Sequence, residues 1–245
     1  MKKLYFYMAA LAVIAGCSNQ FPDTYEGPYS KSNTPSSEYE NPDFVDLGLS
    51  VKWAKCNLGA ENSYDRGTYY RWGDTEGFNV DAKTGTLPFT WDTCPFVDNG
   101  DTTSFTKYNY KYAYGTVDYK YTLDPADDAA TCTNSSWRMP THTEFRELID
   151  NATWTSTALE GINGYMIASK KNPDNWIFLP TTGYINEKTR YDKDAVFAYW
   201  TSSLTISNSY YPTQAVSATA TTSDAGLNRN YNWRFFGMAI RPVKD

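Results

Sequence analysis

Only one segment of this sequence carries a clear helical pattern, and the text around it is typical of β-strands and loops. In "MPTHTEFRELIDN", Thr141 and Glu144 have the three-residue spacing of a capping box, which satisfies free N–H groups at the start of a helix. Apolar residues then recur at the three- and four-residue spacing of one helix face. The pattern predicts a helix over about residues 141–150.

β-strand patterns precede and follow the predicted helix. The alternation in Phe44–Ala54 predicts a first strand, or a hairpin that turns at Gly48. After the helix, "GYMIASKK" and "WIFLPTTGYI" flank a predicted turn at Asn172–Asn175, and "AVFAYWTSS" and "QAVSATATT" add further strands. This order predicts an α+β fold with a mixed, mostly antiparallel sheet and long loops.

The first residues predict a lipoprotein signal. Lys2 and Lys3 precede an uncharged run, residues 4–15, that is too short to span a bilayer but is typical of a secretory signal. Ile14-Ala15-Gly16-Cys17 resembles the bacterial lipobox, which implies cleavage of residues 1–16 and lipid attachment to the sulfur of Cys17. The alternative is an ordinary secreted protein in which this cysteine is a coincidence.

The segment after the signal predicts a tether. Residues 17–42 contain four prolines, many Ser and Asn, and no apolar period, so we expect a flexible linker before a domain over residues 43–245. Ser18, rather than Asp, follows the cysteine, which resembles the pattern of lipoproteins exported to the outer membrane. We therefore expect a lipid-anchored domain of the outer membrane, exposed at the cell surface.

The charge of the mature chain excludes two classes of partner. Loss of Lys2 and Lys3 reduces the 22 basic residues to 20, against 28 acidic ones, so the net charge becomes −8. Nucleic acid and anionic lipid both demand positive charge, and neither is expected as a partner. The membrane contact is expected through the lipid alone.

Three cysteines remain after Cys17, and the oxidising surface compartment permits one bridge among them. Cys94 and Cys132 lie in polar, loop-like text and are the predicted pair, whereas Cys56 has apolar neighbours and is predicted to be a small buried residue. With no C-x-x-C motif and a single histidine, the sequence offers no zinc set, and no metal or cofactor is expected.

Four segments in this order resemble the Fibrobacter succinogenes major paralogous domain, a family borne by lipoproteins: "VDLGLSVKWAKCNLGA", "TLDPADDAATCTNSSWRMPTHTEFREL", "IFLPTTGYI" and "AYWTSS…FGMAIRPV". The resemblance covers residues 43–243 and implies a C-type-lectin-like fold in which the terminal strands pair. It also implies kinship with formylglycine-generating enzymes and with hypervariable ligand-binding proteins. The chain departs from the family pattern at Cys94 and Cys132. Trp137 and Arg138, before the helix, are predicted to be a packed scaffold.

The sequence favours binding over catalysis. His142 is the only histidine and lies in the first turn of the predicted helix, where the helix dipole disfavours a charged imidazole. The resemblance to formylglycine-generating enzymes implies an oxidase with a two-cysteine copper site near the end of the chain. The last 113 residues here contain no cysteine, so the sequence argues against that enzyme. Loop carboxylates could serve a polysaccharide-acting enzyme or calcium, although such acids are usually solvated: Asp74 and Glu76, Asp98 and Asp101, and Asp124, Asp127 and Asp128.

Two surfaces are candidates for ligand binding. The segment Thr205–Asn232 resembles the variable face of hypervariable lectin-like proteins, and the loops that reach Trp233 supply the first set: Tyr210, Tyr211, Asn228, Asn230, Tyr231 and Trp233. The period-two run "YNYKYAY" predicts a strand with four tyrosines on one face, unless that face is a half-buried sheet: Tyr108, Tyr110, Tyr112 and Tyr114.

Together these patterns predict a non-catalytic surface lipoprotein whose lectin-like domain binds an extracellular glycan or protein. Two alternatives stay open. One is an enzyme that acts on polysaccharide through loop carboxylates, and the other is a structural or tip subunit of a surface assembly.

Overall fold

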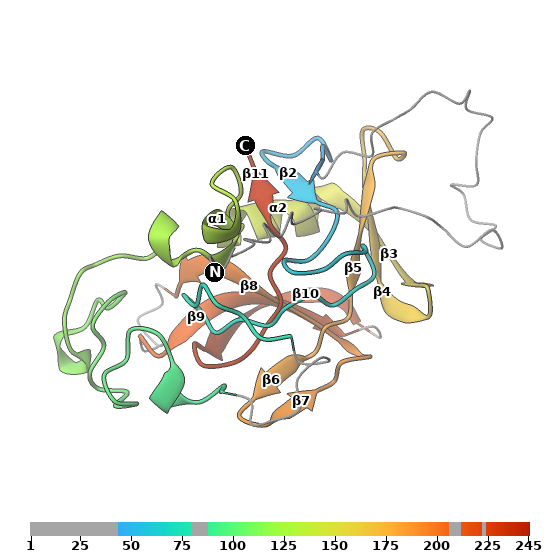
Figure 1. The fold of residues 1–245 in the computed structure, drawn as a ribbon. Helices are drawn as coiled ribbons and strands as arrows, with labels where there is room; N and C mark the ends of the chain where they lie inside the picture. Colours follow the sequence, from blue (N-terminus) through green and yellow to red (C-terminus); the bar gives the residue numbers. More distant parts are fainter. Residues whose placement is uncertain (1–43, 80–87, 206–211, 222–223) are drawn as a thin grey trace, which may run out of the picture.

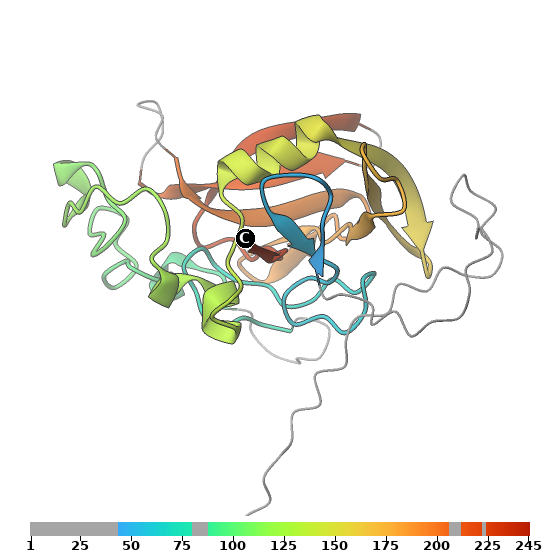
Figure 2. The same cartoon turned by 90° about the horizontal axis from the view of Figure 1, so that it is seen from above.

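The predicted helix and strands assemble into an α+β structure in a computed structural model of the chain (Figures 1 and 2). The structure describes residues 44–79, 88–205, 212–221 and 224–245, with the side chains of residues 221–230 left out. The predicted signal, tether and first domain residue lie outside these ranges. Among the described residues, no helix is long and apolar enough to cross a membrane.

The elements are mostly short, and long irregular segments join them. The helices are α1 (Ala129–Thr133) and α2 (His142–Asn151), with 3₁₀ turns at η1 (Trp91–Thr93), η2 (Tyr112–Tyr114) and η3 (Pro125–Asp127). The strands are β1 (Phe44–Val45), β2 (Lys52–Ala54), β3 (Ala152–Leu159), β4 (Ile162–Ser169), β5 (Trp176–Pro180), β6 (Tyr184–Asn186), β7 (Thr189–Tyr191), β8 (Val196–Leu204), β9 (Gln214–Thr221), β10 (Asp224–Trp233) and β11 (Val243–Lys244).

The two ends of the described chain meet in one small sheet, whose strand order is β1-β2-β11. The predicted hairpin at the start is confirmed: β1 and β2 pair antiparallel, with Phe44 opposite Ala54. Gly48 supplies the positive φ of +75° that the connection needs. On its other side β2 pairs with β11, with Val243 opposite Trp53. The N-terminal and C-terminal strands therefore lie side by side (Figure 1).

Two further antiparallel sheets, β3-β4-β5 and β10-β9-β8, enclose the main core together with α2. The predicted turn between β4 and β5 is confirmed, since the Asn175 N–H donates to the Asn172 carbonyl over 2.9 Å. Figure 2 shows α2 lying across the sheet face, where it contacts β3, β8 and β9. Phe145 and Leu148 of α2 are fully buried there, so the apolar face of the helix closes the core.

The predicted capping box is also confirmed. The Thr141 hydroxyl accepts the Glu144 N–H over 3.3 Å, and a Glu144 carboxylate oxygen accepts the Thr141 N–H over 2.7 Å. The helix begins at His142 and ends at Asn151, one residue from the predicted limit at each end. Local chemistry alone therefore fixes where this helix starts.

Candidate ligand-binding surface

Four aromatic rings follow one another along an edge of the molecule, and we call them the aromatic row: Tyr191, Tyr184, Phe236 and Trp233. Their successive ring centroids are 5.4, 5.4 and 5.9 Å apart. The two end rings are the exposed ones, with 41% of Tyr191 and 45% of Trp233 accessible to solvent. Large exposed aromatics are the informative exceptions on a soluble surface, so this row is the leading candidate for a ligand site.

The β6–β7 hairpin supplies half of the row. Tyr184 and Tyr191 are directly opposite each other in this antiparallel pair, and their rings stack with only 17° between their planes. Glu187 makes the turn with a φ of +55°. The hairpin occupies the lower edge of Figure 1.

The segment after β10 supplies the other half. Ile185 and Gly237 exchange two main-chain hydrogen bonds of 2.8 and 2.9 Å, which hold this segment against the hairpin. Phe236 therefore stacks on Tyr184 with 22° between the ring planes. Gly237 is required at the contact, because a Cβ there would lie 2.4 Å from the Phe89 ring.

Trp233 is held from behind by buried rings. The Phe236 N–H donates to the Trp233 carbonyl over 2.9 Å and closes a turn. This turn places the Phe235 ring against the Trp233 indole, with 5.5 Å between the ring centroids. Phe235 is buried and packs against Trp91 at 5.0 Å. The orientation of the exposed indole is consequently fixed by the fold before any ligand arrives.

The row can stack on a sugar ring or on a partner side chain, and its polar atoms remain available. In the described part of the chain, no hydrogen bond engages the hydroxyls of Tyr184 and Tyr191 or the indole N–H of Trp233. No Lys or Arg of that part lies over these rings, whereas partial burial and the negative charge of Asp192 raise the pKa of Tyr184. The surface is therefore aromatic and hydrogen-bonding, and exposed charges of both signs flank it: Glu187, Lys188, Asp192 and Lys193.

Of the residues predicted in the C-terminal third, Trp233 joins the aromatic row and the others do not. Tyr231 is half-buried in β10, while Tyr210 and Tyr211 lie outside the described residues. The main chains of Asn228 and Asn230 pair with Thr219 and Ser217 of β9, and their side chains lie outside the description.

The prediction of loops is wrong for residues 224–233, which form β10, whereas the predicted strand "QAVSATATT" is confirmed as β9. The Asn and Gly residues of β10 are more typical of a loop than of a strand. Pairing of β10 with β9 decides in favour of the strand, and no local pattern indicates that contact.

The predicted tyrosine strand is wrong as well. Tyr108 is fully buried with a φ of +58°, whereas Tyr112 belongs to a 3₁₀ turn and is 81% exposed, so the tyrosines share no face. The cause is Asp118, whose carboxylate accepts the N–H groups of Tyr108 (2.8 Å), Asn109 (3.0 Å) and Lys120 (3.1 Å). Such side-chain bonds to the main chain compete with strand pairing and fold the segment into a loop.

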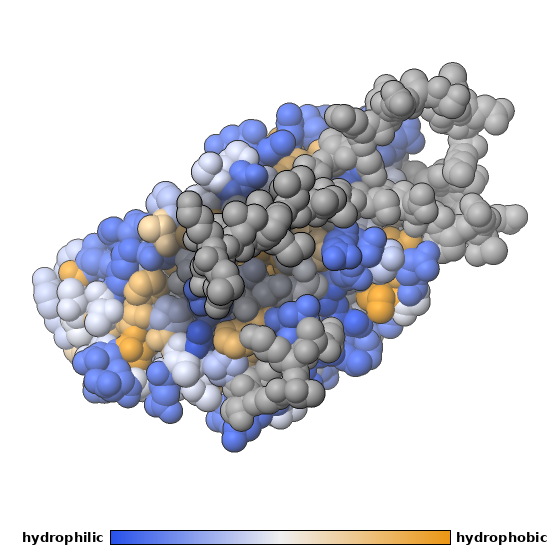
Figure 3. Space-filling view, in the orientation of Figure 1, coloured by the Kyte–Doolittle hydropathy of each residue, from blue (hydrophilic) through white to orange (hydrophobic). Residues whose placement is uncertain are grey.

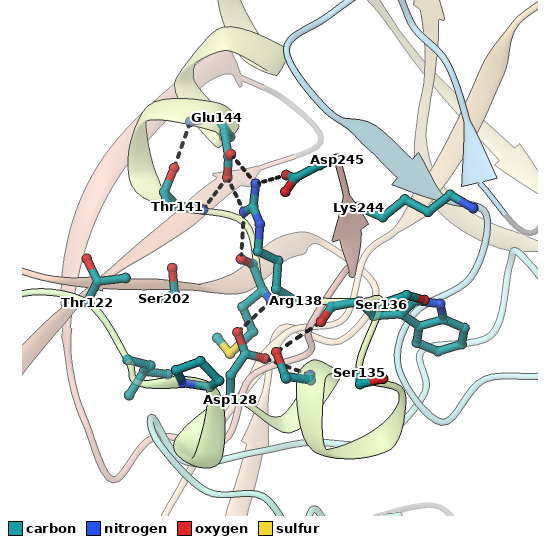
Figure 4. A pocket seen from close by; sticks show the side chains of 15 residues that line it. Thr122, Asp128, Ser135, Ser136, Arg138, Thr141, Glu144, Ser202, Lys244 and Asp245 are labelled. Carbon is teal, nitrogen blue, oxygen red and sulfur yellow. Dashed lines mark hydrogen bonds and ion pairs between the residues drawn. The ribbon is translucent and has the colours of Figure 1, made fainter.

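A hollow lies elsewhere, between α1, the start of α2 and β11 (Figure 4). It has a volume of about 400 Å³, and Arg138 is its central charge. The guanidinium donates to both Glu144 oxygens, at 2.8 and 2.7 Å, and to Asp245 at 2.7 Å. Asp128 is occupied too, accepting from the N–H groups of Ala130 and Met139 over 2.9 and 2.8 Å. These groups hold the scaffold together, as predicted for Arg138.

The ion pair at Arg138 predicts a loss of stability in acid. Burial alone would raise the pKa of Glu144, but hydrogen bonds from Arg138 and from the Thr141 N–H hold it below its usual value of 4.5. A lowered folded-state pKa means stability that is present above pH 4.5 and is lost as the pH falls through the folded value. Glu144→Gln keeps the cap acceptor but removes the charge, so we expect it to cost about 1–2 kcal/mol at neutral pH and much less at about pH 3.

Urea unfolding of the protein and of Glu144→Gln at both pH values measures this difference. Glu160→Gln, in an exposed turn after β3, is the control that removes one carboxylate without breaking the Arg138 pair. A cost of Glu144→Gln that stays constant between the two pH values would contradict the prediction.

Several of the loop carboxylates are held in ion pairs. Asp74 pairs with Arg71 at 2.7 Å, and Lys107 pairs with both Asp124 and Asp127. No group of three or more His, Cys, Asp or Glu residues that could hold a metal ion occurs in the ranges the structure describes.

The predicted bridge between Cys94 and Cys132 is wrong, since both are free thiols. Cys94 is buried, which raises the pKa of its thiol to about 12 against the opposing effect of nearby Arg234. Cys132 is exposed on α1. The polar sequence around both cysteines therefore does not mean that the two side chains are close in space. Cys56 is buried as predicted.

Comparison of the chain with protein-family models, with curated proteins and with solved structures finds no match.

Proposed function

We propose that this chain is a lipid-anchored recognition protein of the bacterial cell surface, whose aromatic row binds extracellular carbohydrate without catalysis. The observation that carries the proposal is the pre-formed row that ends in exposed Trp233 and Tyr191. Aromatic faces with free hydroxyl and indole groups suit the apolar and polar sides of a sugar ring. The lipobox-like Ile14–Cys17 supports the anchor.

A C-type-lectin-like fold is part of the proposal. Three features of the described structure support it: the pairing of the terminal strands β2 and β11, the single long helix α2, and the long irregular segments over residues 71–79 and 94–123. In such a fold, loops and short hairpins on a rigid sheet carry recognition. The aromatic row is built in this way, on the β6–β7 hairpin and the turn after β10.

Trp233→Ala is the direct test. Removing an exposed aromatic anchor of a binding site typically costs about 2 kcal/mol or more, which weakens binding about thirtyfold. The mature protein in detergent is first screened on a glycan array, and the affinity of the best oligosaccharide is then measured by calorimetry for both forms. Tyr112→Ala is the matched control, because this 81% exposed tyrosine lies outside the row.

Each outcome separates the candidate functions. Loss of binding in Tyr112→Ala but not in Trp233→Ala would move the site to the tyrosine loop. Turnover of the oligosaccharide that disappears in Asp74→Asn or Asp101→Asn would indicate the polysaccharide-acting enzyme. Copurification with other surface subunits, without any glycan binding, would favour the structural subunit.

A further inference from the structure

The length of the aromatic row constrains the size of its ligand. The two exposed rings, Tyr191 and Trp233, are separated along the row by Tyr184 and Phe236, which are partly buried. A pyranose is close in size to one aromatic ring, so a single sugar cannot cover both exposed ends. A ligand that uses the whole row must extend over several sugar units.

The row is also rigid enough to favour an extended chain. The two main-chain hydrogen bonds between Ile185 and Gly237 fix the β6–β7 hairpin against the segment that carries Phe236. Tyrosine and tryptophan have only two side-chain torsions each, so little conformational entropy is lost when they contact a ligand. A pre-organised site keeps more of its contact energy as affinity.

The charges around the row select among carbohydrates. No Lys or Arg of the described residues lies over its rings. The charged residues beside Tyr184 and Tyr191 balance, with three of each sign: Glu187, Asp192 and Asp194 against Lys188, Arg190 and Lys193. The mature chain carries 28 acidic and 20 basic residues, so the long-range field is negative. This net negative charge repels a uronate or sulfated chain, and the balanced charges beside the row offer no basic patch to offset the repulsion, whereas a neutral chain is not repelled.

We propose that the aromatic row binds a stretch of neutral polysaccharide, with one sugar subsite on Tyr191 and another on Trp233. This inference rests on the proposed function and specifies its ligand. The free hydroxyls of Tyr184 and Tyr191 and the indole N–H of Trp233 then hydrogen-bond to sugar hydroxyls along the chain.

The test uses the mature protein in detergent with ladders of gluco-, manno- and xylo-oligosaccharides from disaccharide to hexasaccharide, and a galacturonate ladder as the charged counterpart. For at least one neutral ladder, affinity is expected to rise about tenfold or more from disaccharide to hexasaccharide. That affinity is expected to be insensitive to salt, because no ion pair contributes to it. The galacturonates are expected to bind about tenfold more weakly or not at all.

Two substitutions locate the subsites. Trp233→Ala is expected to weaken hexasaccharide binding about thirtyfold and Tyr191→Ala about tenfold, while only one of them affects the disaccharide, which occupies the stronger subsite. Both residues are exposed, and unchanged thermal unfolding shows that the variants are folded. Tyr191→Phe, which keeps the ring, should retain the greater part of the affinity.

The inference and the proposed function fail in different ways. Equal affinity for the disaccharide and the hexasaccharide, or tighter binding of galacturonate, would overturn the inference and leave glycan binding intact. Absence of binding to every ladder and to the glycan array, or binding of a protein ligand only, would overturn both.

Discussion

Arg241→Met is expected to lower the free energy of unfolding by about 3–5 kcal/mol, because it leaves several buried acceptors without a hydrogen-bond donor. The guanidinium is fully buried and donates to the Asn57 side chain, to the Ala54 carbonyl and to the Phe178 carbonyl, each over 2.9 Å. It also donates to the Lys55 carbonyl. Methionine fills much of the volume but offers none of these donors.

The expected loss is large because domains of this kind are stable by only about 5–15 kcal/mol in total. Burial lowers the pKa of Arg241 to about 10, so the group is still charged at neutral pH and every lost bond is charge-assisted. Arg241→Lys is expected to recover little, since an ammonium cannot reach four acceptors in the geometry of a planar fork.

Urea denaturation measures both variants against Arg146→Met. Arg146 lies on the exposed side of α2 and pairs with Asp150 at 2.8 Å, so the loss of that ion pair should cost only about 0.3–0.5 kcal/mol. Equally small losses of stability from the Arg241 and Arg146 substitutions would contradict this prediction. Arg241 would then not be needed to hold its own segment against residues 54–57 and Phe178.

Cys17→Ser is expected to abolish lipid labelling and to shift nearly all of the protein out of the membrane fraction. The proposed thioether needs the Cys17 sulfur, and stable anchoring needs more than one acyl chain, because a single chain binds only marginally. Metabolic labelling with palmitate, followed by membrane fractionation, measures both effects. Cys132→Ser is the control, because this exposed thiol lies on α1 and should leave labelling unchanged.

Two results would contradict the anchor. One is palmitate that remains bound after the Cys17→Ser substitution. The other is a reductant-sensitive peptide pair that joins Cys17 to Cys56, because a sulfur in a thioether cannot also form a disulfide. Mass spectrometry of the mature protein without reductant distinguishes these cases.

The anchor, the tether and the ligand remain predictions from the sequence, but much of the local structure could be tested and is confirmed. The helix start at Thr141, the hairpin through Gly48 and the turn at Asn172–Asn175 are all correct. Each depends on contacts between residues only a few positions apart. For that reason a single stretch of sequence contains all the groups that determine it.

The errors share the opposite property. The "YNYKYAY" run has the alternation of a strand. The carboxylate of Asp118, a few residues further along, accepts the N–H groups of Tyr108 and Asn109 that strand pairing would need. The prediction of a bridge between Cys94 and Cys132 is wrong because the sequence near each cysteine contains no information on the distance between them. Period and composition describe a residue's neighbours along the chain and not those in space.

The candidate site divides in the same way. The sequence by itself determined the α+β class and the capped helix, and it offered Trp233 as one candidate ligand residue among several. Only the tertiary structure decided that Trp233 continues into a row with Tyr184 and Tyr191, which lie more than forty residues earlier in the chain. The physical reason is the separation in sequence of the groups that make the contacts. Capping boxes and tight turns form within one short stretch of chain, whereas the aromatic row depends on main-chain hydrogen bonds between Ile185 and Gly237. Such long-range pairing produces no periodic pattern in the sequence of either segment.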